Sequence, residues 1–344
     1  MKPRTLRPIA IWSAAILFLY CSPSAVHAED RCAPETPPII SLSYVSRYSD
    51  DDGSSSVLDP LREAEAEAAL APLDQFIVDL AVLTDRLYTG TVSDREATST
   101  CILEQLAHWA SADALSDLGT ETVELTIGAR LAAFGMILWQ TSPYAPADPN
   151  RDVILDWLGR RMDAQMAFWE TAHEGAQTGN LRAWAGLAAA AYSLQADSPE
   201  KRDWAVKSVE AVLCTASPDG SLPQEMSRGK YALHYQLHAI APLVSATLLL
   251  ERQRVPISDS CNGALHRVVD FAVSDLSDGK QTQAITGTEQ NLFDGTDTLM
   301  NFQLAWIEPY LLLRSSEALE DLATNFRPLT YSKLGGNQTE LWQR

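Results

Sequence analysis

Two short runs in the second half of the chain place amide, guanidinium and phenol groups close to tryptophan. The first covers residues 180–184 and reads Asn-Leu-Arg-Ala-Trp, and the second extends from residue 222 to residue 235. An amide and a guanidinium at the start of a helix can bind a carboxylate, and a phenol beside a guanidinium can move a proton. Together these residue types could bind an acidic sugar and remove one of its protons.

The second run is expected to lie on a helix over residues 225–252, with Pro223 in a position that suits a first helical turn. Its polar and aromatic residues recur at steps that share one face of a helix otherwise made of Ala, Leu and Ile. They are Arg228, Tyr231, Tyr235 and His238. The alternative is structural: the tyrosines fill the core, Arg228 pairs with Glu225, and the histidines bond backbone carbonyls.

Helical periodicity dominates the rest of the chain, as at Leu73, Phe76, Ile77 and Leu80. The expected helices cover residues 59–88, 94–115, 123–140, 151–172, 179–194, 199–215, 225–252 and 261–276. Strands are scarce, and helices of similar length joined by short turns predict an all-α fold of paired antiparallel helices arranged as a toroid. A long bundle is the alternative. Residues 277–301, rich in Gly, Thr, Gln and Asp, are expected to form a functional loop or lid, or an inert surface loop.

The first residues have the features of an export signal. Three basic residues precede an apolar run over residues 9–20, and residues 26–28 offer a small-residue cleavage site. We expect a signal peptide over residues 1–28, one domain over residues 29–344, and a periplasmic or secreted protein. No later segment approaches the roughly 20 uninterrupted apolar residues of a membrane span.

Four cysteines follow the expected leader, an even set that favours disulfides in an oxidising compartment. Three pairings are possible, and we favour Cys32 with Cys101 and Cys214 with Cys261; alternatively one pair is free and buried. No spacing of Cys and His suits a zinc site, so neither a metal nor a cofactor is expected.

The formal net charge of −19 argues against nucleic acid as a partner, because nucleic-acid binding needs a basic surface. An anionic polysaccharide would also be repelled at long range. Its site must therefore be a local basic cleft, and Arg47, Arg182, Arg228 and Lys230 could line one.

Further motifs extend the pattern over most of the chain. They are residues 46–48 (Ser-Arg-Tyr), 108–115, 180–184, 203–206, 219–223, 305–310 (Ala-Trp-Ile-Glu-Pro-Tyr) and 334–336 (Leu-Gly-Gly), with Cys101, Glu225, Arg228 and Tyr235. In this order and spacing they resemble the periplasmic alginate lyases, poly(β-D-mannuronate) lyases of helical-toroid fold. The resemblance implies β-elimination on a uronic acid polymer without a cofactor, by a protein expected to be a monomer.

Carried over from that family, the matching positions make Tyr235 the catalytic phenol and Arg228 its helper. Asn180 would bind the uronate carboxylate, with Arg47 as a basic residue near the cleft. A tyrosine titrates near pH 10, so a nearby cation such as Arg228 would be needed to hold a phenolate. Lys230, like Tyr231 and His238 on the same stripe, is expected to contact substrate.

One position departs from the family pattern, which has Asn-His where this chain has Asn180 and Leu181. Leu181 cannot replace a histidine chemically. Arg182 or His234 could supply the missing group, and His234, adjacent to Tyr235, is the better candidate base. A polymer of glucuronic acid therefore fits these residues about as well as alginate does.

Indole and phenol rings can also stack on the apolar face of a sugar. We expect Trp184, Trp306 and Tyr310 to be such platforms, and the other helical tryptophans to pack in the core.

Two other classes of protein are compatible with these residues. A glycoside hydrolase would need two carboxylates flanking the bond, for which Asp219, Glu225 and Glu308 are the candidates. A catalytically silent polysaccharide-binding protein would explain the lost histidine. The products discriminate the three, because only a lyase makes an unsaturated uronate that absorbs in the near ultraviolet.

Overall fold

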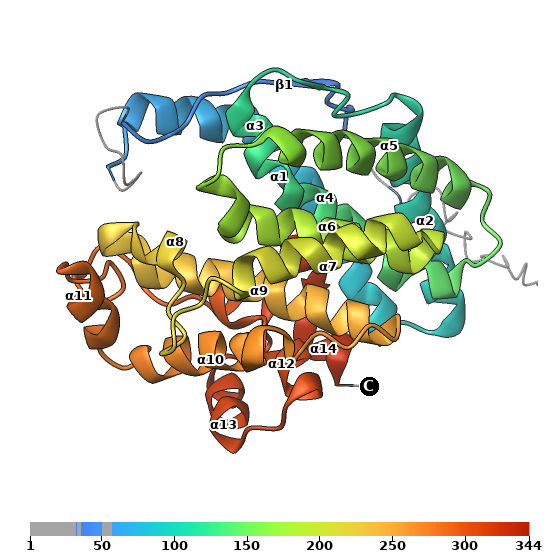
Figure 1. Cartoon of the computed structure of the whole chain (residues 1–344). Coiled ribbons are helices and arrows are strands. Elements are labelled where there is room, and N and C mark those ends of the chain that lie inside the picture. Colours follow the sequence, from blue (N-terminus) through green and yellow to red (C-terminus); the bar gives the residue numbers. More distant parts are fainter. Residues whose placement is uncertain (1–31, 33–35, 50–56, 344) are drawn as a thin grey trace, which may run out of the picture.

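The structure is a computed structural model that describes residues 32, 36–49 and 57–343. Antiparallel helices are arranged in an incomplete ring, as Figure 1 shows. The helices are α1 (Pro60–Thr89), α2 (Val92–Ser111), α3 (Glu121–Thr126), α4 (Gly128–Thr141), α5 (Asn150–Thr171), α6 (Asn180–Ala196), α7 (Pro199–Leu213), α8 (Pro223–Met226), α9 (Ala232–Arg252), α10 (Ser260–Asp275), α11 (Lys280–Thr286), α12 (Ile307–Leu313), α13 (Glu317–Phe326) and α14 (Gln338–Trp342). The predicted all-α toroid is confirmed.

Sheet structure in the described part is limited to two short pairs. The strands β1 (Ser41–Leu42) and β2 (Asp117–Leu118) are parallel, and β3 (Thr330–Tyr331) and β4 (Gly336–Asn337) are antiparallel. The second pair flanks a 3₁₀ turn, η6 (Ser332–Leu334), that packs against α1, α4 and α9. The C-terminal segment is thereby held against the helices that form the core.

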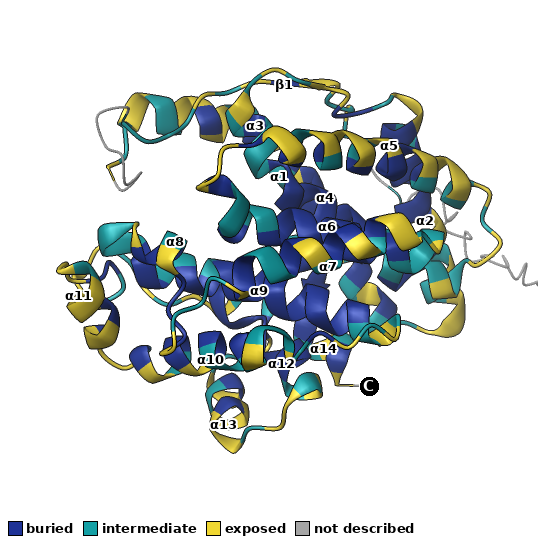
Figure 2. Ribbon diagram, in the orientation of Figure 1, coloured by how far each residue is buried: buried dark blue, intermediate teal, exposed yellow. Residues whose placement is uncertain are grey.

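Helix α6 is the centre of the core and packs against α4, α7 and α9. Its sequence after Arg182 consists largely of Ala with Trp, Leu and Gly, so neighbouring helices can approach closely. At Gly128 in α4, an added Cβ would lie 2.8 Å from the backbone N of Ala185 in α6. Figure 2 shows α4, α6 and α9 mostly buried, whereas α5, α7 and α13 expose one face each.

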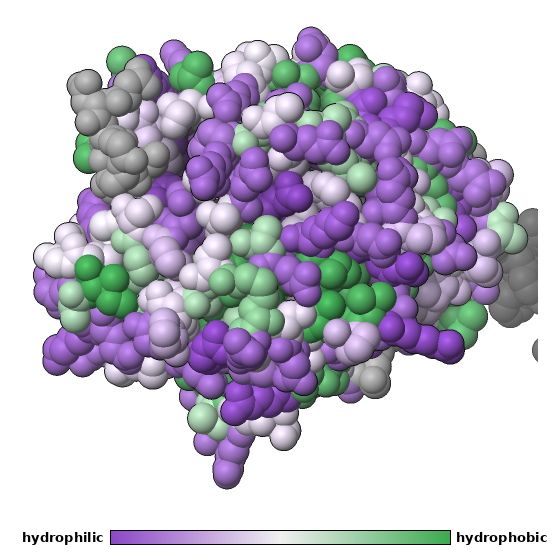
Figure 3. Space-filling view, viewed as in Figure 1, coloured by the Kyte–Doolittle hydropathy of each residue, from purple (hydrophilic) through white to green (hydrophobic). Residues whose placement is uncertain are grey.

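Two helical stretches reach the length and mean hydropathy of a membrane span, at residues 121–144 and 229–252. Their apolar windows are 72% and 83% buried inside the protein, which is the environment of core helices. The face of the molecule in Figure 3 is mainly hydrophilic, with smaller hydrophobic patches between polar side chains.

The expected continuous helix over residues 225–252 is wrong. Helix α8 ends at Met226, the 3₁₀ turn η4 (Gly229–Tyr231) follows, and α9 begins at Ala232. Gly229 adopts a φ of +55°, a left-handed conformation that interrupts a right-handed helix and that glycine adopts without steric cost. Arg228 therefore precedes the helix that carries Tyr235, and the predicted single stripe is divided between two elements.

Other helix boundaries also differ from those that the apolar periodicity predicted. Residues 123–140 form two helices that meet at Ile127, and α2 ends at Ser111 instead of residue 115. Asp113 and Leu115 have φ values of +53° and +58°, which a helix cannot contain. Residues 277–301 are only partly a loop, because α11 forms within them.

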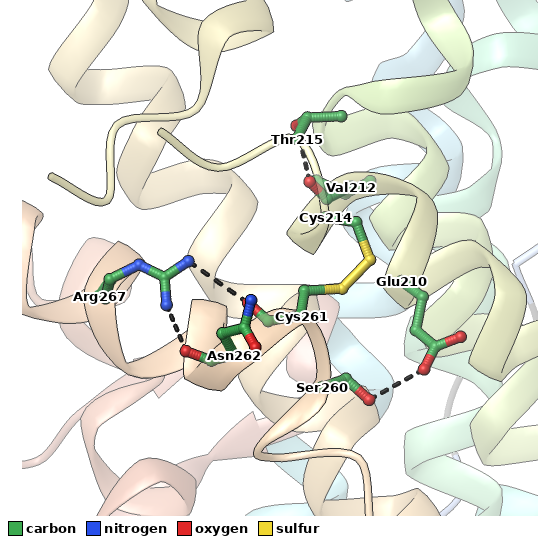
Figure 4. Close-up of a disulfide and its surroundings, with 8 residues drawn as sticks. All are labelled: Glu210, Val212, Cys214, Thr215, Ser260, Cys261, Asn262 and Arg267. Atoms are coloured by element: carbon green, nitrogen blue, oxygen red, sulfur yellow. Dashed lines mark hydrogen bonds between the residues drawn. A yellow bond between two sulfur atoms is a disulfide. The ribbon is translucent and has the colours of Figure 1, made fainter. Parts of the chain in front are cut away.

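Both favoured disulfides are present. Cys32 pairs with Cys101, and Cys214 pairs with Cys261. The second bond, shown in Figure 4, joins the end of α7 to the start of α10.

The turn at this second disulfide is held by further polar contacts. Ser260 Oγ donates to Glu210 Oε1 at 2.8 Å, so α10 is tied to α7 a second time. The guanidinium of Arg267 donates to the carbonyl oxygens of Cys261 and Asn262, both of which have left-handed φ values. These bonds satisfy carbonyls that the left-handed turn takes out of the regular helical pattern.

Gly220 provides a test of how tightly the loop before α8 packs on α10. Its φ is +96°, and an added Cβ would lie 2.0 Å from the carbonyl oxygen of Arg267. We expect Gly220→Ala to lower the free energy of unfolding by about 3 kcal/mol or more, from left-handed strain plus overpacking. Gly295, at a φ of +82° with nothing within 4 Å, is the matched control. Gly295→Ala should cost only about 1–2 kcal/mol, and equal losses in chemical denaturation would contradict the packing argument.

Candidate active site

Tyr235 lies in the first turn of α9, beside residues from the N-terminal segment and from the turn before α9. Its hydroxyl forms a hydrogen bond with the hydroxyl of Tyr48. The guanidinium carbon of Arg228 lies 4.0 Å from the ring centre of Tyr235 and 4.9 Å from that of Tyr48. In Figure 1 the start of α1 and helix α8 lie on the same side of the molecule, on the left. The structure thus brings Arg228 to Tyr235 as predicted and adds Tyr48, which was noted only within a motif.

Tyr235 is a neutral phenol in this structure. Burial raises its pKa above the ordinary value, and the nearby charges of Arg228 and Arg47 only partly oppose that effect. Arg228 therefore lies where a cation was expected, but its charge does not keep the hydroxyl of Tyr235 deprotonated before the reaction. Any phenolate must form during the reaction, when Arg228 can stabilise it from the ring face.

Asn180 is the first residue of α6 and is buried, with 4% of its surface exposed. Its backbone N–H donates to Glu225 Oε1 at 2.7 Å, and its Nδ2 donates to Glu225 Oε2 at 2.9 Å. Burial raises the pKa of Glu225 to about 7, although the bonds from Asn180 and the charge of Arg228 lower it. The side chain of Glu225 thus bonds Asn180 and not Arg228, the partner considered in the structural alternative. The contact with Asn180 was not predicted from the sequence.

The two histidines of α9 have different environments. His238 Nε2 accepts a hydrogen bond from Trp184 Nε1 at 3.0 Å, and burial lowers its pKa well below the ordinary value. His234 lies edge-on to Tyr235, with Nδ1 3.8 Å from a carboxylate oxygen of Asp297. Burial lowers its pKa as well, against the opposing charge of Asp297. Both imidazoles are therefore neutral near pH 7, and His234 Nδ1 accepts a hydrogen bond from Gln303 Nε2 at 3.4 Å.

Lys333 is a basic residue near the site that the sequence reading missed. It lies in η6, where burial and the charges of Arg130 and Arg47 lower its pKa to about 8. Its charge in turn lowers the pKa of His238, as do those of Arg228 and Arg130. The only signal in the sequence was its position directly before the Leu-Gly-Gly motif.

Arg130 has a bidentate ion pair with one carboxylate. Its Nε and Nη2 donate to the two carboxylate oxygens of Asp74 at 2.9 and 2.7 Å. Arg47, Arg130, Arg228 and Lys333 thus bring positive charge toward α9 from four parts of the chain.

Arg182, expected to bind substrate, instead packs among helices. Its guanidinium carbon lies 4.3 Å from the ring centre of Trp204 in α7 and 5.3 Å from that of Trp169 in α5. Burial lowers its pKa to about 10. Two residues after Asn180 on a helix, it occupies a different face of α6, so the prediction of a shared carboxylate site was wrong.

The three expected sugar platforms are also wrong, because Trp184, Trp306 and Tyr310 are at most 1% exposed. Trp184 Nε1 bonds His238, and Trp306 Nε1 donates to the carbonyl of Gln303 at 2.8 Å. Tyr310 borders a cavity of about 230 Å³ between α10, α12 and α13, apart from the residues around Tyr235.

Lys230 and Tyr231 lie in the η4 turn and contact each other. Lys230 Nζ is 4.9 Å from the ring centre of Tyr231, and both side chains are partly exposed. Their roles toward substrate stay predictions.

The candidate carboxylates of a hydrolase have structural partners. Asp219 accepts from Ser221 N and Oγ at 2.9 and 2.8 Å, and Glu308 accepts from Arg327 Nε at 2.7 Å. Glu225 is bound to Asn180. Nothing in these contacts favours a pair of carboxylates acting across a glycosidic bond.

Comparisons with known proteins agree with the fold. The family model described as Alginate lyase matches residues 119–282. An alginate lyase of Cobetia marina is 24% identical over 318 residues, covering 90% of this chain and 82% of that protein. A polysaccharide lyase of Stenotrophomonas maltophilia is 28% identical over 331 residues, covering 93% and 92%. Over most of its length this chain is similar to alginate lyases and to a polysaccharide lyase. It is thus a polysaccharide lyase.

Solved structures support the fold of this protein. A variant of alginate lyase A1-III complexed with a tetrasaccharide superposes with a TM-score of 0.77 at 21% identity, covering 94% of this chain and 88% of that one. Alginate lyase A1-III from Sphingomonas species A1 gives 0.73 at 22% identity, covering 91% and 87%.

The contacts of Arg182 generate a prediction that separates stability from catalysis in this lyase. Arg182→Met removes two cation–π contacts but keeps the length of the side chain. We expect the free energy of unfolding to fall by about 1–2 kcal/mol and KM for a uronan to stay within twofold of wild type. Thermal unfolding and steady-state kinetics measure the two effects. A rise in KM without a loss of stability would restore Arg182 as a substrate ligand.

Proposed function

We propose that this protein cleaves a β-1,4-linked uronic acid polymer by β-elimination. The observation that carries the proposal is the neutral phenol of Tyr235, held by Tyr48 and covered by Arg228, among cations that can receive a carboxylate. β-Elimination requires the C5 carboxylate to be neutralised, because that neutralisation acidifies the C5 proton. Lys333 and Arg47 supply charge for this step, and Asn180 retains one Nδ2 hydrogen beyond the one that Glu225 accepts.

The proton transfers can be divided between neighbouring residues of α9. His234 is neutral near pH 7, and its Nδ1 accepts a hydrogen bond from Gln303 Nε2 at 3.4 Å, so the proton of the neutral ring lies on Nε2. Nδ1 is therefore the atom that can take a further proton, and Asp297, 3.8 Å away, stabilises the imidazolium that forms. His234 takes the C5 proton, the C4–O4 bond breaks as the C4–C5 double bond forms, and the hydroxyl of Tyr235 protonates the departing O4. Arg228 stabilises the phenolate, and transfer of the proton from His234 to Tyr235 restores the site.

Alginate of polymannuronate type is the first substrate to test, because several relatives are named alginate lyases. Glucuronan is the second, because Leu181 stands where the family pattern has histidine. We also propose that residues 1–28, which lie outside the described residues, direct export to the periplasm. Incubation of the purified protein with polymannuronate, polyguluronate, glucuronan and hyaluronan, followed by near-ultraviolet absorbance, tests reaction and substrate together. New reducing ends without that absorbance would instead indicate a hydrolase, and binding without products a silent relative.

Tyr235→Phe tests the proton donor. The change removes one hydroxyl and keeps the ring under Arg228, so we expect kcat to fall 10²- to 10⁴-fold with circular dichroism unchanged. Tyr88→Phe is the matched control, because it removes a phenol hydroxyl bonded to Gln140, outside the site. Near-wild-type turnover by Tyr235→Phe would refute the mechanism.

The titration of Lys333 leads us to expect weaker substrate binding at alkaline pH. Its pKa of about 8 means that the ammonium is charged below that pH and neutral above it, so KM should rise as the pH increases from 7 to 9. Lys333→Met should raise KM about tenfold or more at pH 7 and abolish the further rise. Lys333→Arg should move this rise in KM to higher pH. If all three proteins show the same dependence of KM on pH, Lys333 does not bind the polymer.

A further inference from the structure

The side chain of Glu225 is fully buried, and both of its oxygens accept hydrogen bonds from a single residue. The donors are the backbone N–H of Asn180 at 2.7 Å and its Nδ2 at 2.9 Å. As the first residue of α6, Asn180 has a backbone N–H without a partner in that helix. A carboxylate at this position also interacts favourably with the helix dipole. Glu225 therefore closes the start of α6 and fixes the side chain of its first residue.

The approach of α8 to α6 leaves no space for rearrangement. At Gly179, directly before α6, an added Cβ would lie 2.8 Å from Gln224 Cγ and 3.4 Å from Glu225 Oε1. Arg228 N donates to the carbonyl oxygen of Glu225 at 3.1 Å. Residues 225–228 thus place the carboxylate of Glu225 against Asn180 and the guanidinium of Arg228 over Tyr235.

The chemistry of the two groups determines the orientation of the amide. An ionised carboxylate only accepts hydrogen bonds, so it selects Nδ2 of Asn180 and turns away Oδ1. Oδ1 has no hydrogen-bond partner among the described residues. With another partner the amide could rotate by half a turn and present its oxygen, which repels a carboxylate, in place of its nitrogen.

We infer that Glu225 is a positioning residue: its two hydrogen bonds hold the Asn180 carboxamide in the orientation whose remaining N–H meets the uronate carboxylate. The inference rests on the proposed function, since it assigns Asn180 to that carboxylate. Glu225 itself does not touch the sugar. It acts through Asn180, and it does so only while it is an acceptor at both oxygens.

This hold depends on the charge of Glu225. When protonated, its O–H would suit Oδ1 of Asn180 and would permit the rotated amide. The pKa of Glu225 is about 7, raised by burial and lowered by Asn180 and the charge of Arg228. Of the elements packed against α8, α9 carries the neutral His234 and Tyr235, and α11 carries Lys280. Activity is therefore expected to be present above pH 7 and to fall as the pH drops through 7.

Glu225→Gln tests the inference, because its amide is neutral at every pH and offers one donor and one acceptor. We expect kcat/KM at pH 8 to fall 10- to 100-fold, as misplaced groups do, and the acid limb near pH 7 to disappear. Glu225→Asp keeps the charge and should keep an acid limb with a smaller loss. The control is Glu308→Gln, another buried glutamate, which pairs with Arg327 outside the site. It should lower the melting temperature and leave the limb in place.

Initial rates from pH 5 to 9, with circular dichroism of each variant, decide among the outcomes. A folded Glu225→Gln protein with the kcat/KM and acid limb of wild type overturns the inference. If that variant does not fold, the wild type decides, because absence of an acid limb near pH 7 also overturns it. His234→Gln distinguishes the titration of Glu225 from that of His234. The residual activity of this variant should still fall as the pH drops through 7. A wild-type protein that makes no unsaturated product from any polymer refutes the proposed function itself.

Discussion

The guanidinium of Arg228 lies over two phenol rings from distant parts of the chain, and the geometry of the site depends on this contact. In a continuous helix, residues 228 and 235 would be separated by roughly 10 Å along the axis. The left-handed Gly229 and the η4 turn interrupt the helix, so that Arg228 folds back over Tyr235. The same break ends α8 after one turn, which leaves Glu225 facing the start of α6. A local interruption therefore positions the cation, the phenol and the amide together.

The protein has a net charge of −19, yet several cations lie close to Lys333. They affect the pKa of this lysine. Asp74 neutralises Arg130, but burial and the neighbouring arginines still lower the pKa of Lys333 to about 8. An anion bound beside Lys333 would favour its charged form and raise that pKa. Substrate binding and protonation of this lysine are thus linked, and the site becomes most cationic when the polymer occupies it.

Much of the fold could be predicted from the sequence, because amphipathic periodicity and Pro or Gly at the breaks report local structure. The pairing of Cys214 with Cys261 was also correct, since both cysteines lie close to expected helix ends. Arg182 shows an avoidable error: two residues after Asn180 on a helix, it is turned by about 200° from it. Lys333 and the contact between Glu225 and Asn180 could not be found in this way, because they join segments far apart in the chain. The break at Gly229 was missed because polar and aromatic residues keep a helical spacing across it, from Arg228 to His238.

Leu181 shows how the chemistry of this site is divided. It is partly buried and packs against the apolar core, so its position supplies neither a proton acceptor nor a charge. The neutral imidazole in contact with Tyr235 belongs to His234 on α9, and additional charge comes from Lys333 in η6. In the proposed mechanism the cations and the proton acceptor therefore lie on elements other than α6, which contributes the amide of Asn180. With its base on α9 instead of α6, the proposed mechanism removes the C5 proton from a different direction, and this is the physical reason to test uronans other than polymannuronate.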